Sequence, residues 1–188
     1  MKKLLYIEEE FLNPTLCKPF IDLHIKENDT FLESVTHSNS NESLSYSPDI
    51  PEMGGDHGAI YLGGDVEPVD IKLSKDELFV SVIGKVTKIC KSFHNNIQLD
   101  YCGVIQWPAG TFMKPHIDPH RPDQEPDLFA AVLYLNDDYI GGHTGFEESE
   151  IKPETGKLLV FSNSIYKHHV TKIEGSERFA LNIWYNRK

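Results

Sequence analysis

The spacing of apolar residues changes about halfway along the chain. In the first half, two stretches repeat apolar residues at the spacing of an amphipathic helix. An Asn-Pro pair supplies an N-cap and a first-turn proline, which predicts a helix from Pro14 to about Lys26. Ser74 and Glu77 form a capping box, which predicts a second helix that ends near Phe93. We expect both helices to pack on the outside of a sheet.

Short alternating runs replace the helical spacing in the second half and predict strands. Together with one strand near the N-terminus, the expected strands are Leu4–Ile7, Tyr101–Trp107, Met113–Asp118, Leu128–Leu135, Gly142–Phe146, Lys157–Phe161, His168–Ile173 and Arg178–Tyr185. Glycine, proline and acidic residues separate the strands of the second half as turn signals. Short strands with such breaks indicate a sandwich or barrel, so the predicted fold class is mainly β with flanking helices.

The length of 188 residues is that of one domain. We expect residues 1–188 to form a single domain, in which residues 1–96 provide helical support and a long loop and residues 97–188 form the β core.

The long loop runs from Ser34 to Gly58 and contains few large apolar residues. A loop of this length is a disordered or plain surface connection, or it is a lid over an active site. As a lid, it would offer Tyr46, Met53 and the nearby Tyr61 to a substrate.

Charge and cysteine content exclude several classes of protein. The formal net charge is −11 at pH 7, without a basic stripe for phosphate backbones, so we expect no nucleic-acid partner. The three cysteines are widely spaced and form no Cys-x-x-Cys pair, which argues against a zinc site or a disulfide framework. The N-terminal apolar run is too short for a signal peptide, and no run approaches a membrane span. We therefore expect a cytoplasmic protein without a membrane partner.

The candidate chemistry lies in His116, Asp118, His168 and Arg178. His116 and Asp118 are two residues apart on an expected strand, so their side chains share a face. Two imidazoles and one carboxylate can occupy one face of a metal and leave other positions open, which suits non-haem Fe(II). Arg178 follows His168 by ten residues and offers a planar fork to one end of a dicarboxylate.

Further motifs accompany these residues in a fixed order along about 85 residues. They are Gln106-Trp107-Pro108-Ala109-Gly110, His116-x-Asp118, Leu133-Tyr134-Leu135-Asn136, Gly141-Gly142, Pro153-x-x-Gly156-x-Leu158-Leu159-x-Phe161, and His168-x-Val170 followed by Arg178 and Trp184. This series resembles the 2-oxoglutarate/Fe(II) oxygenase superfamily and looks closest to its prolyl 4-hydroxylase-like branch. The resemblance implies a double-stranded β-helix (jelly-roll) core supported by two N-terminal helices. It also implies Fe(II), 2-oxoglutarate and O2, with ascorbate as a candidate reductant.

The resemblance also selects the second histidine ligand. The family pattern has apolar residues two and five positions after this ligand. From His168 these positions are Val170 and Ile173, whereas from His169 they are polar. His168 is thus the expected ligand, and strand alternation should turn His169 outward.

The groups that assist Arg178 are less clearly marked. Asn182 and Trp184 share its strand face; Asn182 could bond the co-substrate or metal-bound water, and Trp184 either walls the iron or is core. Many prolyl 4-hydroxylases have a tyrosine nine residues before the first ligand, where this chain has Trp107. Some relatives use instead a tyrosine just before Tyr-Leu-Asn, where this chain has Leu133, with Tyr134 on the opposite face. Help for Arg178 is therefore open among Trp107, Thr111, Tyr101 and Asn182.

Other histidines lack ligand spacing or fall in expected loops. We expect no metal-ligand role for His24, His57, His120 and His143. The rim loop that includes Arg121 could touch substrate.

The function implied by the resemblance is hydroxylation of a C–H bond, with peptidyl proline as the leading substrate. A free amino acid or small metabolite is an alternative substrate, and a non-catalytic metal-binding jelly-roll module is an alternative function. A nucleic-acid demethylase of the AlkB type fits poorly, because such enzymes carry a second arginine six residues beyond the first, where this chain has Trp184. The expected partner is a peptide or small molecule, and the oligomeric state is open.

Overall fold

The structure is a computed structural model that describes residues 5–25, 53–54, 58–59, 77–118 and 128–187. Several sequence expectations concern residues outside these ranges or side chains that are not described. They involve the Ser34–Gly58 loop with Tyr46 and His57, the side chains of Met53 and Tyr101, and Tyr61, Ser74, His120 and Arg121.

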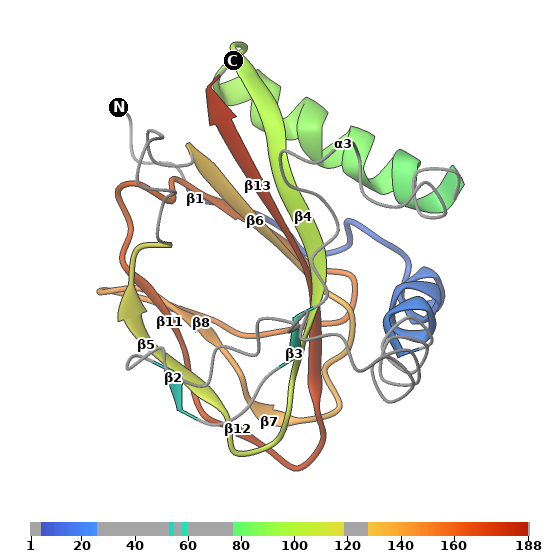
Figure 1. The fold of residues 1–188 in the computed structure, drawn as a ribbon, viewed down its shortest axis with the longest axis vertical. Coiled ribbons are helices and arrows are strands. Elements are labelled where there is room, and N and C mark those ends of the chain that lie inside the picture. Colours follow the sequence, from blue (N-terminus) through green and yellow to red (C-terminus); the bar gives the residue numbers. More distant parts are fainter. Residues whose placement is uncertain (1–4, 26–52, 55–57, 60–76, 119–127, 188) are drawn as a thin grey trace, which may run out of the picture.

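Strands form most of the regular secondary structure of the described chain and are arranged as two larger sheets that face each other (Figure 1). Across the described residues, the larger sheet has six antiparallel strands in the order β1 (Leu5–Glu8), β10 (Leu158–Phe161), β6 (Phe129–Tyr134), β13 (Arg178–Arg187), β4 (Ile97–Trp107) and β3 (Gly58–Ala59). The smaller sheet has β2 (Met53–Gly54), β5 (Phe112–His116), β11 (His168–Val170), β8 (Thr144–Gly145) and β9 (Glu150–Ile151). A short ladder joins β12 (Ile173–Glu174) to β7 (Ile140–Gly141). The mainly β class expected from the sequence is confirmed.

Both faces of the larger sheet are covered. All six residues of β6 are buried. Leu133 and its outward-facing neighbours join a cluster with helical residues, whereas Tyr134 joins a second cluster between the sheets. A strand that is buried on both sides reads as a continuous apolar run, so its sequence does not reveal which residues face which layer.

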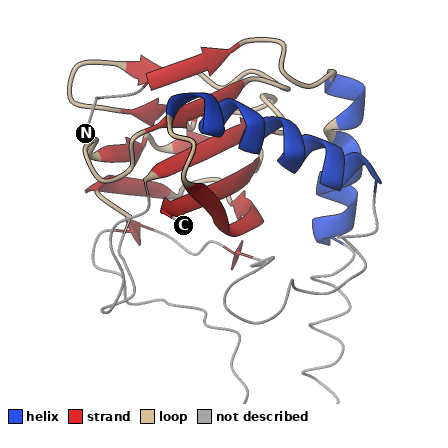
Figure 2. Cartoon of the chain, turned by 90° about the horizontal axis from the view of Figure 1, so that it is seen from above, coloured by secondary structure: helices blue, strands red, loops and turns tan. Residues whose placement is uncertain are grey.

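Helices cover the outer face of this sheet (Figure 2). Helix α3 (Glu77–Phe93) turns one apolar side inward, formed by Phe79, Val82, Val86 and Cys90. Such burial, rather than intrinsic propensity, supplies most of a helix's stability.

The first expected helix is broken into two parts. The 3-10 turn η1 spans Pro14–Leu16, with Asn13 capping it by accepting from the Thr15 backbone N–H. Residues 18–25 then form a separate helical segment. One continuous helix would require the backbone nitrogen of Pro19 to donate to the Thr15 carbonyl, and proline has no N–H to donate.

Two expected strands also differ from those in the structure, and the one expected over Gly142–Phe146 is shortened to β8, Thr144–Gly145. Around β7 and β8, Gly141 and Gly142 adopt positive φ angles of 75° and 63°, which end one ladder before the next begins. Gly141 admits no side chain, because a Cβ there would lie 1.9 Å from the backbone oxygen of Lys172. The expected strand from His168 to Ile173 likewise divides into β11 and β12.

The three cysteines are buried and free. Burial raises the pKa of the Cys17 and Cys102 thiols to about 11 and that of the Cys90 thiol to about 12. They are therefore packing residues rather than reactive thiols.

No helix in the described part of the chain combines the length and apolar character that a membrane crossing needs.

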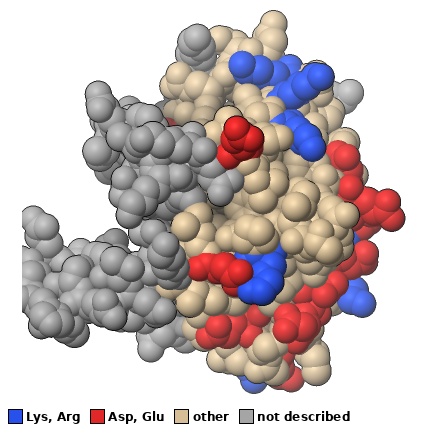
Figure 3. Space-filling model, turned by 90° about the vertical axis from the view of Figure 1, so that its right-hand side faces the viewer, with Lys and Arg blue, Asp and Glu red and all other residues tan. Residues whose placement is uncertain are grey.

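Among the residues coloured in Figure 3, acidic side chains gather toward one side of the visible face and basic ones stand in separate groups.

His24 contacts the larger sheet from the helical segment 18–25. It is 4% exposed, its Nε2 lies 3.2 Å from Oε1 of Gln106 on β4, and its ring meets Phe179 edge-on. Burial lowers its pKa from the ordinary value of 6.5, and the Gln106 hydrogen bond only partly offsets this effect. The packed imidazole is thus neutral at neutral pH.

We predict that His24 makes the fold less stable as the pH falls below about 6.5, because the unfolded chain then binds a proton that the folded state resists. One such proton contributes a slope of at most about 1.4 kcal/mol per pH unit. Urea unfolding of the metal-free protein between pH 7.5 and 5 should show a smaller loss of stability in His24→Gln than in the wild type. Equal pH dependence in the two proteins would contradict this role.

Candidate metal centre and co-substrate pocket

Strand pairing brings the two histidines together. In the antiparallel ladder of β5 and β11, His116 is the direct partner of His168. Directly paired residues extend their side chains from the same face of a sheet. The ring centres are 4.3 Å apart, and both rings face the space between the sheets.

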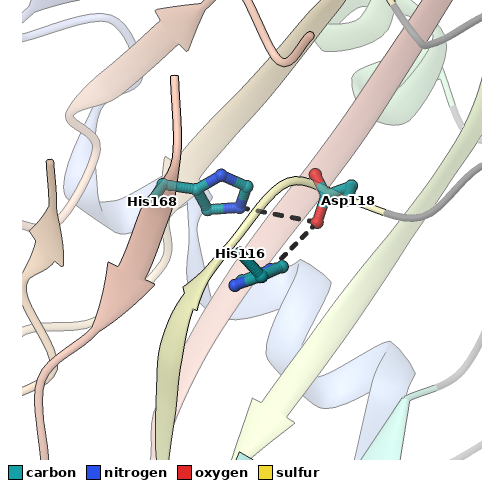
Figure 4. A group of neighbouring side chains, drawn as sticks. All are labelled: His116, Asp118 and His168. Carbon is teal, nitrogen blue, oxygen red and sulfur yellow. Dashed lines mark hydrogen bonds and ion pairs between the residues drawn. The ribbon is translucent and has the colours of Figure 1, made fainter. Parts of the chain in front are cut away.

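Asp118 completes the group from just beyond the end of β5. Its Oδ1 lies 3.2 Å from Nε2 of His116 and 3.4 Å from Nε2 of His168 (Figure 4). Within the described ranges, this is the one group of three histidine, cysteine or acidic residues whose donor atoms all lie within 4.8 Å of one another. The structure corrects the expected cause of this approach: β5 ends at His116, so the turn of the chain after the strand, not strand alternation, aims the carboxylate.

Backbone carbonyls orient both imidazoles. His116 Nδ1 is 2.8 Å from the Lys114 oxygen, and His168 Nδ1 is 3.5 Å from the Tyr166 oxygen, a longer contact. A carbonyl can only accept, so each Nδ1 donates to its carbonyl, and each Nε2 is the ring nitrogen that faces Asp118. Such carbonyl partners are the usual support of a metal-binding histidine.

This arrangement brings two imidazole nitrogens and a carboxylate oxygen to one point, where a cation could contact all three. Burial by itself would raise the pKa of Asp118, but hydrogen bonds from His116, His168 and Trp184 hold it well below its ordinary value. The carboxylate is therefore ionised and carries the negative charge of the group. Two imidazoles and one carboxylate fit Fe(II) by their chemistry.

Arg178 supplies a second charged group in the same cavity. It begins β13, is 2% exposed, and places its Cζ 5.5 Å from the ring centre of Trp107 and 5.4 Å from that of Tyr134. Its Nε and Nη1 have no hydrogen-bond partner among the described residues. A buried charge that lacks an anionic partner is costly, so the pocket is suited to receive a carboxylate.

Tyr134 lies beside Arg178, contrary to the expectation that it would face away. Its hydroxyl donates to Oγ1 of Thr144 over 2.6 Å, and its Cα partner on β13 is Ala180, on the strand face of Arg178. Leu133 instead faces the helices. Six consecutive buried residues do not show which of them face the cavity. Only the register of β6 with β13 shows that Tyr134 does.

The cavity between the sheets has a volume of about 90 Å³. It is lined by the two charged groups and by apolar side chains between them. The lining residues are Ile105, Trp107, Met113, His116, Asp118, Ala130, Ala131, Val132, Thr144, Phe161, His168, Val170, Arg178, Asn182 and Trp184. Asn182 lines the cavity, and its buried Oδ1 has no hydrogen-bond partner in the described part of the chain. Trp184 donates its indole N–H to Oδ2 of Asp118 over 2.8 Å, so it does more than fill the core.

Two further candidates have other roles. The Thr111 hydroxyl donates to the Pro108 carbonyl over 2.7 Å and belongs to a turn. His169 points away from the cavity, with its Nε2 3.9 Å from a carboxylate oxygen of Glu150, whose other oxygen is 3.2 Å from Nδ1 of His143. Neither histidine joins the metal-binding group.

We predict that Asp118→Asn weakens Mn(II) binding by at least about 100-fold, because it removes the only negative charge among the three ligands. A Mn(II) titration measures this affinity, with the free ion detected by electron paramagnetic resonance. Asp22→Asn, which alters an exposed carboxylate paired with Lys18, should bind as the wild type does. Retained affinity in Asp118→Asn would show that the ion binds elsewhere.

Known proteins resemble the chain in sequence and in fold. Residues 102–186 match the family model of the 2OG-Fe(II) oxygenase superfamily. Human prolyl 3-hydroxylase 3 is 32% identical over 65 residues, which cover 30% of this chain and only 9% of that protein's length.

Solved structures extend the likeness to almost the whole chain. The viral collagen prolyl hydroxylase vCPH of Paramecium Bursaria Chlorella virus-1 superposes with a TM-score of 0.68 at 16% identity, over 96% of this chain and 94% of that one. The prolyl-4-hydroxylase of Pseudomonas putida gives 0.68 at 20% identity, over 98% and 92%. A prolyl hydroxylase of Trichoplax adhaerens, in complex with a hypoxia inducible factor peptide fragment, gives 0.64 at 19% identity, over 97% and 83%. Residues 102–186, which carry the His116, Asp118 and His168 group and Arg178, therefore resemble the 2OG-Fe(II) oxygenase superfamily, within a chain that has the fold of solved prolyl hydroxylases.

Proposed function

We propose that this protein is an Fe(II)- and 2-oxoglutarate-dependent dioxygenase that hydroxylates a C–H bond, with peptidyl proline as its substrate. One observation carries the proposal: the His116, Asp118 and His168 group and the buried cation of Arg178 border the same cavity. The superfamily's cofactor and co-substrates are Fe(II), 2-oxoglutarate and O2.

His116, Asp118 and His168 would hold the iron through Nε2, Oδ1 and Nε2. Bound Fe(II) supplies activation of O2 coupled to oxidative decarboxylation of 2-oxoglutarate to succinate and CO2. Two imidazoles and one carboxylate would leave other positions of the ion to co-substrate and oxygen.

Arg178 would bind the carboxylate of 2-oxoglutarate that is remote from the iron. Tyr134 and Thr144 share a hydrogen bond beside it, and either hydroxyl can turn a proton toward the incoming anion. Trp107 lies against the guanidinium and Asn182 adds a polar atom to the cavity wall. The apolar lining keeps water away and so strengthens each of these electrostatic contacts.

Peptidyl proline is favoured over other substrates by the prolyl hydroxylases that share the fold, one of them in complex with a peptide. In this proposal residues 97–188 form a double-stranded β-helix core, and residues 1–96 support it with two helices. A free amino acid or small metabolite as substrate, and a non-catalytic metal-binding module, are the competing functions.

The deciding experiment measures succinate formed from 2-oxoglutarate with Fe(II), O2 and ascorbate, in the presence of proline-rich peptides. The proposed function requires iron-dependent succinate and a peptide heavier by one oxygen atom on proline. Succinate without peptide modification would move the substrate to a free amino acid or metabolite. Metal binding without any succinate would favour a non-catalytic module.

We predict that Arg178→Ala raises the KM for 2-oxoglutarate roughly 10- to 100-fold, the loss expected for one or two charge-assisted hydrogen bonds. Mn(II) affinity should change little, because the guanidinium contacts none of the three ligands. Arg187→Ala, at the exposed end of the same strand, serves as the matched control. A KM that stays within twofold of the wild-type value would place the distal carboxylate elsewhere.

A further inference from the structure

Trp184 contacts the metal-binding group from the opposite sheet. Its indole N–H donates to Oδ2 of Asp118 over 2.8 Å, while Oδ1 of the same carboxylate faces the two histidines. The two oxygens thus have different surroundings. We propose that Trp184 is a positioning residue that makes Asp118 a ligand through Oδ1 alone, an inference that rests on the metal site of the proposed function.

Asp118 needs such a contact because β5 does not extend to it. The strand ends at His116, and Ile117 already exposes 39% of its surface. Whereas His116 is held by its ladder with β11, the Asp118 carboxylate is oriented by side-chain contacts. Apart from the two histidines that share the ion with it, the hydrogen-bond partner the structure gives Asp118 among the described residues is Trp184.

Trp184 is itself held rigidly. It lies within β13, which pairs with β4 on one side and β6 on the other. Its partner on β6 is Ala130, whose short side chain leaves room for the indole over the sheet. The register of β13 with β4 shifts between Trp184 and Tyr185, and such irregularities commonly redirect a side chain beside an active site.

The hydrogen bond has two consequences for a bound ion. An N–H that donates to a carboxylate is a strong, charge-assisted contact, and it fixes the rotation of the carboxylate. With Oδ2 occupied by the indole, Asp118 contributes one oxygen and keeps further coordination positions open for co-substrate and oxygen. Without the N–H, Oδ2 can turn toward the ion and take one of those positions.

Trp184→Phe tests this inference, because it removes the N–H and keeps an aromatic ring. Loss of such an outer partner lowers metal affinity by about 10- to 100-fold, which a Mn(II) titration should detect. With Co(II) as the probe, the visible absorption bands should shift as Oδ2 joins the coordination. A role in packing alone would not change this spectrum.

Two other variants complete the test. Tyr6→Phe removes a donor from a carboxylate that does not line the cavity, because the Tyr6 hydroxyl donates to Glu8 over 2.7 Å, and should leave Mn(II) affinity and the Co(II) spectrum unchanged. Trp184→Gln restores an N–H donor without the ring and should recover part of the lost affinity. Circular dichroism establishes whether each variant is folded. If Trp184→Phe does not fold, the comparison of Trp184→Gln with the wild type decides.

The outcomes separate this inference from the proposed function. If the wild type binds Mn(II) and Co(II) but Trp184→Phe has the same affinity and spectrum, the positioning role is wrong and the metal site stands. If Trp184→Gln loses as much affinity as Trp184→Phe, the ring rather than the N–H matters, and the inference also fails. If the wild type binds neither ion, the metal site itself is wrong.

Discussion

The antiparallel pairing of β5 with β11 is the constraint on which the site depends. It sets His116 directly opposite His168, so two imidazoles from residues 52 positions apart extend from one face of the sheet. A shift of either strand by one residue would turn its histidine to the outside, because side chains alternate between faces. His169 illustrates that outcome, since it lies one position further and contacts Glu150 on the other face.

The two sheets contribute different parts of the chemistry. The smaller sheet and the turn that follows β5 supply the three atoms of the candidate metal site. The larger sheet supplies Arg178, Asn182 and Trp184 from alternate positions of β13. Their intervening neighbours pack beneath the helices, so the burial that stabilises the fold also fixes the strand that carries the polar groups. A catalytic or binding group requires this kind of rigid support to hold its geometry.

Local patterns were sufficient to name the three side chains that the structure brings together and to predict much of the β core. His116, Asp118 and His168 have the residue types and spacing of an iron site, and the motifs around them lie in a family order. The choice of His168 over His169 followed from the apolar residues after it. In the fold, Pro19 divided an expected helix and paired glycines shortened an expected strand, because single residues can interrupt a hydrogen-bond pattern that apolar spacing favours.

The sequence by itself determined which side chains can bind a metal and a carboxylate, since this depends on residue type and on spacing within single strands. Tertiary structure alone decided that Tyr134 stands beside Arg178, that Trp184 donates to Asp118, and that the Asp118 carboxylate turns inward after its strand has ended. Those contacts join residues distant in the chain through the register of strands buried on both faces. A continuous apolar run carries no record of that register, because either face of such a strand meets an apolar layer.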